Sequence, residues 1–158
     1  LGVDAGEVDS RFPVQVVSTG LPFIIAPLTS LDAVKRARFN LFGSAEALEG
    51  LPTKAVLIFA PETEQKMNDL HARVFAGFYG VAEDPATGSA NGCLAGYLAK
   101  HRYFQSGEIH IAVEQGYELN RPSRLLLQTT QEDEQIRISV GGRVIPIAEG
   151  TLDVSQSS

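Results

Sequence analysis

The sequence predicts an α+β domain in which a curled, barrel-like sheet of mixed or antiparallel strands surrounds one central apolar helix. Between Asp84 and Lys100 no side chain is charged, so a helix there has no polar stripe for solvent and must be enclosed by protein. Short apolar runs elsewhere in the chain have the character of strands. The last four of these runs follow one another without a helix between them, which argues against regular α/β alternation.

The first half of the chain is expected to combine strands with one helix. In chain order we expect a linker or a segment entering from upstream at 1–10, strands at 14–17 and 23–28, a helix at 31–51, a buried strand at 55–60, a loop at 62–69 and a strand at 71–75. Ser30 is a possible helix start, and Gly50-Leu51-Pro52 is a typical helix end. The strand at 71–75 then delivers the chain to a turn at 83–85.

After the apolar helix the sequence predicts four strands in succession, at 109–113, 124–130, 135–140 and 144–148. Residues 131–134 are expected to be a charged hairpin loop, and Gly141-Gly142 a tight hairpin turn. The polar tail after Gly150, residues 151–158, is expected to fray. Residues 11–150 thus form one domain, which is large enough to bury its own core.

The start of the apolar helix is the predicted site of chemistry. Asp84 before Pro85 is typical of a helix cap followed by the first helical residue. Thr87, Gly88 and Ser89 would then offer free backbone N–H groups at the positive end of the helix dipole, where an anion binds. The turn has no Lys or Arg, which favours a carboxylate over a polyphosphate. Neither the phosphate-loop pattern nor the Gly-x-Ser-x-Gly hydrolase elbow fits these residues.

Composition and charge narrow the classes of partner and site. A net charge of −6 without a basic stripe disfavours nucleic acid and anionic membranes, and no apolar stretch is long enough for a membrane span. Cys93 is the only cysteine, which excludes an internal disulfide and a cysteine metal cage. His71, His101 and His110 lack metal-ligand spacing, so we expect no metal site and interpret each as a polar residue at a strand edge or helix end. Without a signal peptide, a cytoplasmic protein is the default.

The octapeptide from Glu83 to Ala90, Glu-Asp-Pro-Ala-Thr-Gly-Ser-Ala, resembles the signature of the phenazine-biosynthesis PhzF-like isomerases, which share the diaminopimelate epimerase fold. Flanking residues agree and occur in the expected order: Ser18-Thr19-Gly20-Leu21-Pro22-Phe23, Arg73-Val74-Phe75, Gln115-Gly116, Arg121-Pro122-Ser123 and Gly141-Gly142. The likeness covers nearly the whole chain but only half of a family member. Such enzymes are pseudo-symmetric two-domain proteins, and this chain resembles their C-terminal domain.

The resemblance implies a cofactor-independent isomerase that moves a proton on a small carboxylate-bearing substrate by acid/base catalysis in an interdomain cleft. It implies a catalytic carboxylate at Asp84 and a catalytic, substrate-contacting hydroxyl at Ser89. The substrate carboxylate would bind Thr87, Gly88 and Ser89. The family's catalytic glutamate and histidine lie on the N-terminal domain, so the chain is expected to need that domain as a partner for activity. The complete protein is expected to be a homodimer.

Plainer interpretations of the same residues stay open. Asp84 can be a helix cap alone, and the domain a non-catalytic carboxylate-binding or assembly unit, or a structural relative in which the motif survives only as a cap. Glu83 is expected to be a surface acid favoured by the helix dipole rather than a catalyst. Arg73 and Arg121 can neutralise a second carboxylate of the ligand, but surface ion pairs are the favoured interpretation. Cys93, inside the apolar run, is expected in the core, which excludes a thiol mechanism.

Overall fold

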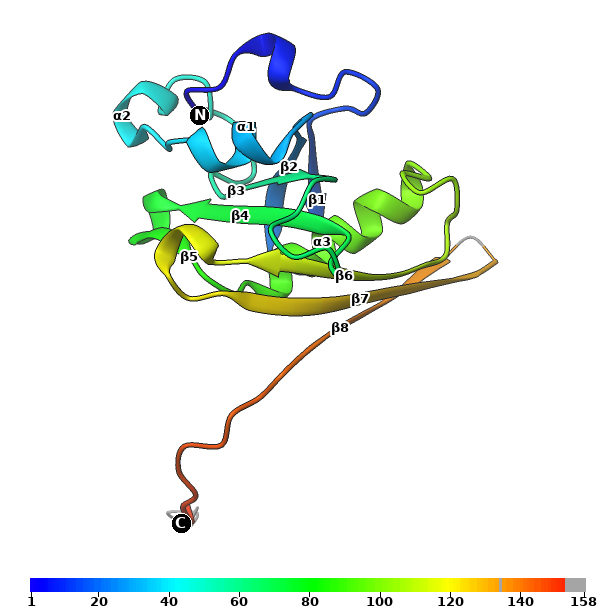
Figure 1. The fold of residues 1–158 in the computed structure, drawn as a ribbon. Helices are drawn as coiled ribbons and strands as arrows, with labels where there is room; N and C mark the ends of the chain where they lie inside the picture. The colour runs from blue at the N-terminus through cyan, green and yellow to red at the C-terminus, as the bar shows by residue number, and fades with distance from the viewer. Residues whose placement is uncertain (134, 153–158) are drawn as a thin grey trace, which may run out of the picture.

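The computed structural model describes residues 1–133 and 135–152 and contains one eight-stranded sheet (Figure 1). Its strands are β1 (Gln15–Ser18), β2 (Pro22–Pro27), β3 (Val56–Ala60), β4 (Leu70–Ala76), β5 (Val81–Asp84), β6 (Ile109–Gln115), β7 (Ser123–Glu132) and β8 (Gln135–Gly142). The helices are α1 (Leu31–Arg36), α2 (Leu41–Ser44) and α3 (Gly88–Lys100), with short 3-10 helices η1 (Ala5–Glu7), η2 (Gly77–Tyr79) and η3 (Tyr117–Leu119). Among the described residues, none of the helices is long and apolar enough to cross a membrane.

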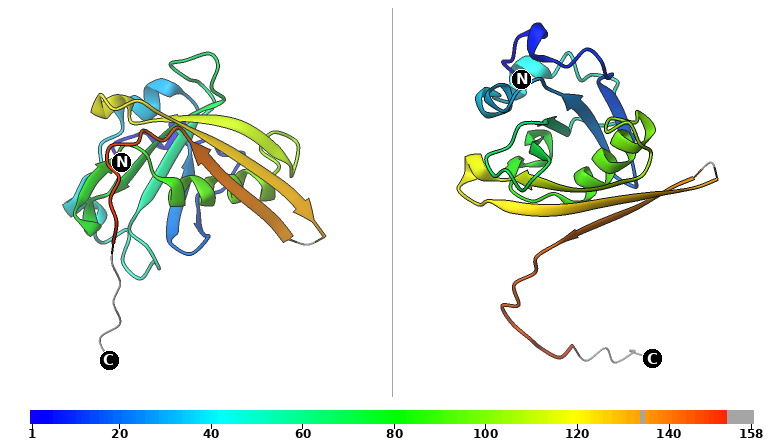
Figure 2. Two further views of the ribbon diagram at one scale, coloured as in Figure 1. Left: turned by 90° about the horizontal axis from the view of Figure 1, so that it is seen from below. Right: turned by 45° about the vertical axis from the view of Figure 1, so that its right-hand side comes forward.

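The sheet is mixed and curled. Its strand order is β1-β2-β3-β4-β6-β7-β8, with β5 paired to β4 outside this path. β2 pairs in parallel with β3, and β4 with β6, whereas the other pairs are antiparallel. The two ends of the sheet approach each other, because α3 packs against β1 and β2 at one end and against β7 and β8 at the other (Figure 2). The prediction of a curled mixed sheet with few helices is confirmed.

Helix α3 is buried along most of its length, as its lack of charged side chains before Lys100 requires. Its buried residues are 90–95 and 97–99. Leu94, Tyr97 and Leu98 belong to the core cluster between the helix and the sheet, and burial of each such side chain contributes about 1.5–3 kcal/mol. The Tyr97 hydroxyl donates a hydrogen bond to the Pro13 carbonyl at 2.8 Å. Cys93 is fully buried among them, as predicted for a core residue.

Strands β2 and β3 are covered on both faces, which explains why their sequences are continuous apolar runs rather than alternating ones. In β3, Leu57 and Phe59 face α3, while Val56 and Ile58 face a second core cluster beneath α1. Residues 1–10 lie over the same outer layer, where Leu1 and Val3 pack against this second cluster. The α1 side of the sheet thus has its own core, separate from the core around α3.

The single helix predicted at 31–51 is wrong, because the structure has two short helices there. Ser30 does start α1, since its side chain accepts the Ala33 N–H at 3.2 Å. The helix ends at Arg36 because Ala37 is extended (ψ 136°), and the Arg73 guanidinium donates to the carbonyls of Val34, Lys35 and Ala37. The carbonyls at the end of α1 are therefore hydrogen-bonded by Arg73, a buried cation from strand β4.

The predictions for the last part of the chain also need correction. Gly141 and Gly142 are not a hairpin turn: they extend β8 and pair with Leu126 and Leu125 of β7. No strand forms at 144–148, where the chain leaves the body of the domain (Figure 1). The hairpin between β7 and β8 is tighter than the predicted loop at 131–134, because Glu132 already pairs with Gln135. Residue 134 and residues 153–158 of the expected tail lie outside the described residues.

Candidate active site

The motif turn, residues 83–90, joins the end of β5 to the start of α3. Thr87, whose backbone is extended (φ −106°, ψ 95°), is the N-cap of α3, and its carbonyl accepts the Asn91 N–H at 3.1 Å. The prediction that Asp84 caps the helix, with Pro85 as its first residue, is therefore wrong. Asp84 is still paired with Val74 in the sheet, so the helix begins only at Gly88.

The carboxylate of Asp84 is half-buried and is held by the side chain of Thr87. The Thr87 hydroxyl donates to Asp84 Oδ2 at 2.6 Å. A threonine at an N-cap usually turns its oxygen toward the N–H groups of its own helix, but Thr87 makes no such bond. The hydroxyl thus fixes the acid and leaves the first turn of α3 without a side-chain cap.

Gln115, fully buried at the end of β6, holds the turn from behind. Its Nε2 donates to the Asp84 carbonyl at 2.6 Å and to Thr87 Oγ1 at 3.1 Å. Its Oε1 accepts from Asn91 Nδ2 at 2.9 Å and from the Thr87 N–H at 3.4 Å. The Thr87 amide, which the sequence predicted to be free for a ligand, therefore faces Gln115.

The next two backbone amides are open. Within the described residues the N–H groups of Gly88 and Ser89 have no acceptor, and both residues are exposed. A Cβ atom at Gly88 would meet nothing within 4 Å, so a ligand can approach this backbone closely. These amides lie at the positive end of the dipole of α3, which favours a negative group. Asn91 Oδ1, buried in the same turn of helix, has no hydrogen-bond partner in the described structure.

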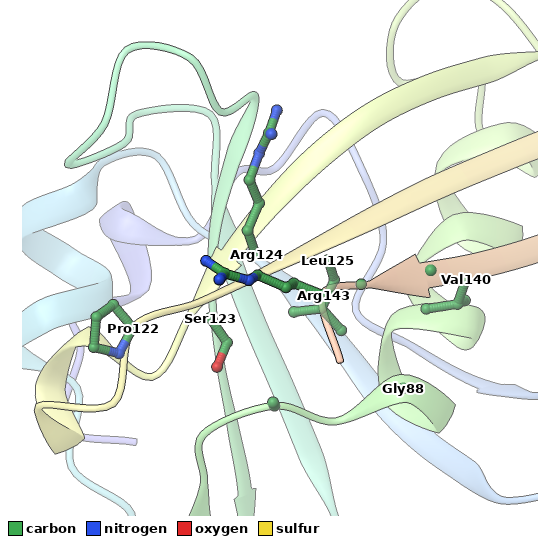
Figure 3. Close-up of a pocket in the computed structure, with 10 residues that line it drawn as sticks. Gly88, Pro122, Ser123, Arg124, Leu125, Val140 and Arg143 are labelled. Atoms are coloured by element: carbon green, nitrogen blue, oxygen red, sulfur yellow. The ribbon is translucent and has the colours of Figure 1, made fainter. Parts of the chain in front are cut away.

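A cavity of about 490 Å³ adjoins this helix start (Figure 3). Three separate segments line it: Ala86 and Gly88 of the motif turn, residues 122–125 at the start of β7, and residues 140–143 at the end of β8. Three of the motif fragments singled out in the sequence thus meet at one hollow. Ser89 directly follows the lining residue Gly88, and Asp84 lies two residues before Ala86, but neither of them lines the cavity.

Two arginines line the cavity, and neither is one that sequence reasoning had proposed. Arg124 is engaged by Asn68, whose Oδ1 accepts from its Nε at 2.9 Å. Arg143 is exposed and follows directly after Gly141-Gly142, which was the one signal in the sequence that could have found it. Arg121, proposed as a surface partner, is exposed and does not line this cavity.

Behind the motif turn lies a buried ion cluster, which consists of His71, Arg73, Glu83, Glu114 and Glu118. Arg73 is only 4% exposed and binds both carboxylate oxygens of Glu83 at 2.8 Å. The predictions of a surface Arg73 and of a surface acid at Glu83 are therefore wrong. Because Glu83 precedes Asp84, this bidentate pair anchors the strand that presents the acid.

His71 is the other centre of the ion cluster. Its Nδ1 lies 2.7 Å from Glu114 Oε1 and its Nε2 lies 3.0 Å from Glu118 Oε1, with the ring fully buried in β4. Burial opposes the charged imidazole, but the hydrogen bonds and charges of Glu118 and Glu114 outweigh it, so the pKa of His71 is raised. Burial likewise opposes both carboxylates, but the bonds from His71 prevail and the pKa values of Glu114 and Glu118 are lowered. The prediction of His71 as a strand-edge residue is wrong.

The remaining histidines lie away from the motif turn. His101 is the C-cap of α3, as predicted, and its Nε2 lies 2.7 Å from Gln15 Oε1. Burial and then the charge of Lys100 lower the pKa of His101. His110 is an exposed residue of β6. In the part of the chain that the structure describes, no group of three or more His, Cys, Asp and Glu side chains could hold a metal ion.

Comparison with known proteins places these features in a family. The model of the PhzC-PhzF family, described as phenazine biosynthesis-like protein, matches residues 2–150. The chain belongs to this family. The PhzF-like resemblance predicted from the octapeptide and its flanks is thereby confirmed. The motif turn and the fragments that line the cavity all lie within the matched residues.

Named members of the family are isomerases. The trans-2,3-dihydro-3-hydroxyanthranilate isomerase of Pseudomonas fluorescens is 32% identical over 93% of this chain and 50% of its own length. The enzyme of the same name from Pseudomonas aeruginosa is 35% identical over 89% of this chain and 48% of its own length. A PhzF family protein from Bacillus anthracis has a solved structure that superposes with a TM-score of 0.79 at 28% identity, over 90% of this chain and 49% of that one. The chain thus spans about half the length of the relatives it matches.

Proposed function

We propose that this chain is the C-terminal domain of a cofactor-independent isomerase with the two-domain diaminopimelate epimerase-like architecture, which moves a proton on a small carboxylate-bearing substrate. One observation supports this most directly. The motif turn combines a half-buried carboxylate, Asp84, with the open amides of Gly88 and Ser89 beside a cavity. An acid and an anion-binding turn in such proximity suit the removal of a proton from a carbon near a carboxylate.

In the proposed reaction the substrate carboxylate binds the N–H groups of Gly88 and Ser89, and the Ser89 hydroxyl orients it. The Asp84 carboxylate takes a proton from a neighbouring carbon, and the electron pair of the broken C–H bond moves into the conjugated system of the substrate. A proton is then returned to a different carbon, so that a C–H bond re-forms there and the elements of the substrate are conserved. The amides stabilise the negative charge that develops on the carboxylate side.

The reaction needs a second proton-handling group on the opposite side of the substrate. Apart from Asp84 and its neighbour Glu83, which is paired with Arg73, the described residues of the motif turn carry no acid or base. The resemblance assigns the other groups, a glutamate and a histidine, to the N-terminal domain. We therefore propose that this domain closes the cleft over the motif turn, that the chain alone is inactive, and that the complete protein is a homodimer.

The test uses the complete two-domain protein with trans-2,3-dihydro-3-hydroxyanthranilate, the compound named by the Pseudomonas relatives. Asp84→Asn keeps the shape but removes the base, and we expect turnover to fall roughly 10²–10⁴-fold, the usual contribution of a general acid or base. Ser89→Ala should lower turnover less. In D₂O the wild-type protein should incorporate deuterium into the product. Unchanged turnover of Asp84→Asn would remove this carboxylate from the mechanism, and full turnover by the chain alone would refute the need for a second domain.

A second function, a carboxylate-binding module without catalysis, is favoured by the open amides of Gly88 and Ser89, because they can bind an anion without help from Asp84. Titration of the chain with 3-hydroxyanthranilate, followed by the amide resonances of these two residues, measures binding directly. If both wild-type and Asp84→Asn complete proteins bind this compound and neither turns over any carboxylate tested, the module is the correct interpretation.

A further inference from the structure

The Gln115-Gly116 pair was singled out in the sequence, and the proposed reaction does not use it. Gln115 is fully buried, yet all of its hydrogen-bonding groups are directed at one short stretch of chain, from Asp84 to Asn91. A buried glutamine must hydrogen-bond its amide group, and every partner of the Gln115 side-chain amide belongs to the turn that carries the candidate acid or to the first turn of the helix that follows it. These contacts therefore show how Gln115 is connected to Asp84.

The direction of each hydrogen bond follows from two backbone carbonyls, which can only accept. The Thr87 carbonyl accepts from Asn91 at 2.9 Å, which identifies the contacting Asn91 atom as the amide nitrogen Nδ2. That nitrogen also contacts Gln115 at 2.9 Å, so the Gln115 atom there must be the acceptor Oε1. The other Gln115 atom is then the donor Nε2, in agreement with its 2.6 Å contact to the Asp84 carbonyl.

Thr87 completes the sequence of bonds. Gln115 Nε2 uses its second hydrogen on Thr87 Oγ1 at 3.1 Å, so the Thr87 oxygen is an acceptor in that contact. The single hydroxyl hydrogen of Thr87 is then free to point at Asp84 Oδ2, 2.6 Å away. A hydroxyl that donates to Oδ2 holds this oxygen as an acceptor. The other oxygen, Oδ1, is left as the atom of Asp84 that can exchange a proton with a substrate.

We propose that Gln115 is a positioning residue, which acts through Thr87 to fix the orientation and the proton-exchanging oxygen of the Asp84 carboxylate. The inference rests on the proposed function for its effect on turnover, but the bonding pattern itself is a property of this chain. Gln115 touches neither the open amides of Gly88 and Ser89 nor the cavity, so its effect should fall on the chemical step rather than on substrate binding.

Gly116 supports the same arrangement by close contact. Its φ of +85° lies in the left-handed region, and a Cβ there would be 2.4 Å from the Arg121 carbonyl oxygen and 2.7 Å from the Pro85 carbonyl oxygen. The backbone of the motif turn therefore rests directly on the backbone at Gly116. This contact brings Gln115 within hydrogen-bond reach of Asp84 and Thr87.

The test in the complete protein compares three substitutions that keep size nearly constant. Thr87→Val removes the hydroxyl, and Gln115→Glu removes the two N–H donors. Each should lower kcat by about 10–100-fold, the usual effect of misplacing a catalytic group, with KM within about threefold of wild type. Thr87→Ser keeps the hydroxyl and should restore kcat to within about threefold of wild type. Gln128→Glu, the same change at an exposed residue of β7, is the matched control and should leave both constants unchanged.

A second measurement on this chain separates failure of the inference from failure of the proposed function. The ¹³C resonance of the Asp84 carboxyl carbon reports its hydrogen bonds without any substrate, and it should move in Thr87→Val and Gln115→Glu but stay in place in Thr87→Ser. If the resonance moves while Asp84→Asn leaves turnover intact, Gln115 and Thr87 do position the Asp84 carboxylate and the proposed reaction is wrong. If the resonance stays in place in Thr87→Val, or if kcat stays at the wild-type value in both variants while Asp84→Asn is inactive, the positioning role is overturned. Should Gln115→Glu not fold, the Thr87 pair decides the matter.

Discussion

The ion cluster and the motif turn are two polar regions supported by neighbouring residues of the same strand. The ion cluster consists of paired charges, whereas the motif turn surrounds one acid with neutral groups. Glu114 and Gln115 are adjacent in β6, so their side chains point to opposite sides. Glu114 serves the ion cluster, where His71 lies between two carboxylates and Arg73 holds a third. Gln115 serves the motif turn, where neutral amide groups and a hydroxyl surround one acid.

This difference distinguishes charged residues that stabilise the fold from the residues of the candidate site. In the ion cluster the side chains of His71 and Glu114 are fully enclosed, so the charges of this pair act on the fold. In the motif turn the only charge at its centre, Asp84, is half-buried, and its supporting groups are neutral. The fold thus places its strong ion pairs behind the motif turn and surrounds Asp84 with neutral groups.

The largest expected effect is on the ion cluster. His71→Leu leaves Glu114 and Glu118 buried without their shared cation, and removal of one partner of a buried pair costs about 3–5 kcal/mol in the free energy of unfolding. Urea denaturation of this chain measures the loss. His110→Leu, at an exposed position of β6, is the control and should stay within about 0.5 kcal/mol of wild type. A loss below about 1 kcal/mol in His71→Leu would mean that the cluster does not stabilise the fold.

The next effect concerns the contact between β6 and the motif turn. Gly116→Ala adds a Cβ where the backbone is left-handed and where two carbonyl oxygens lie within 2.7 Å, so both strain and overlap are expected. We expect a loss of about 3 kcal/mol, of which about 1 kcal/mol is the left-handed backbone alone.

Gly80 is a matched control for this substitution. Its φ of +84° is almost the same as that of Gly116, but a Cβ there would meet nothing within 4 Å. Gly80→Ala should therefore cost only about 1 kcal/mol. The difference between the two variants in urea denaturation isolates the close approach of the turn. Equal losses would show that the motif turn can move away from Gly116 at no cost, and would weaken the case for a fixed Asp84.

The sequence was informative where the interaction is local. The chargeless run from Pro85 to Ala99 predicted a buried helix, and the octapeptide predicted the family. Ser30 was recognised as a helix start because its bond to Ala33 spans only three residues. The start of α3 was misplaced because pairing of Asp84 with Val74 in the sheet overrides the local preference for a cap before proline.

The missed features all depend on contacts between distant parts of the chain. Gln115 meets Thr87 across 28 residues, and His71 meets Glu118 across 47, distances at which no periodicity or cap pattern carries information. The same holds for Arg73, which ends α1 by binding carbonyls 36–39 residues away. A histidine or arginine in a strand that is predicted to be buried must have polar partners. The identity of these partners depends on the order of the strands in the sheet.

The smallest expected effect is the change with pH in the stability that the ion cluster contributes. This change is also the most direct check on the charges of the cluster. The pKa of His71 is raised above its reference of 6.5, so its stabilisation is fully present below pH 6.5 and is lost as pH rises through the raised pKa. The pKa values of Glu114 and Glu118 are lowered below 4.5, so their stabilisation is present above pH 4.5 and is lost as pH falls through the lowered pKa values. The cluster therefore contributes most between pH 4.5 and 6.5.

An NMR titration of the imidazole resonances tests this window within the folded state. His71 should titrate above pH 6.5 and His101, whose pKa is lowered, below it. Glu118→Gln removes one of the two carboxylates on His71 and should bring its midpoint down, whereas the midpoint of His101, at the far end of α3, should not change. A His71 midpoint at or below 6.5 in the wild-type chain would mean that a neutral imidazole lies between the two acids. The contrast between a charged architectural cluster and a neutral frame around Asp84 would then be lost.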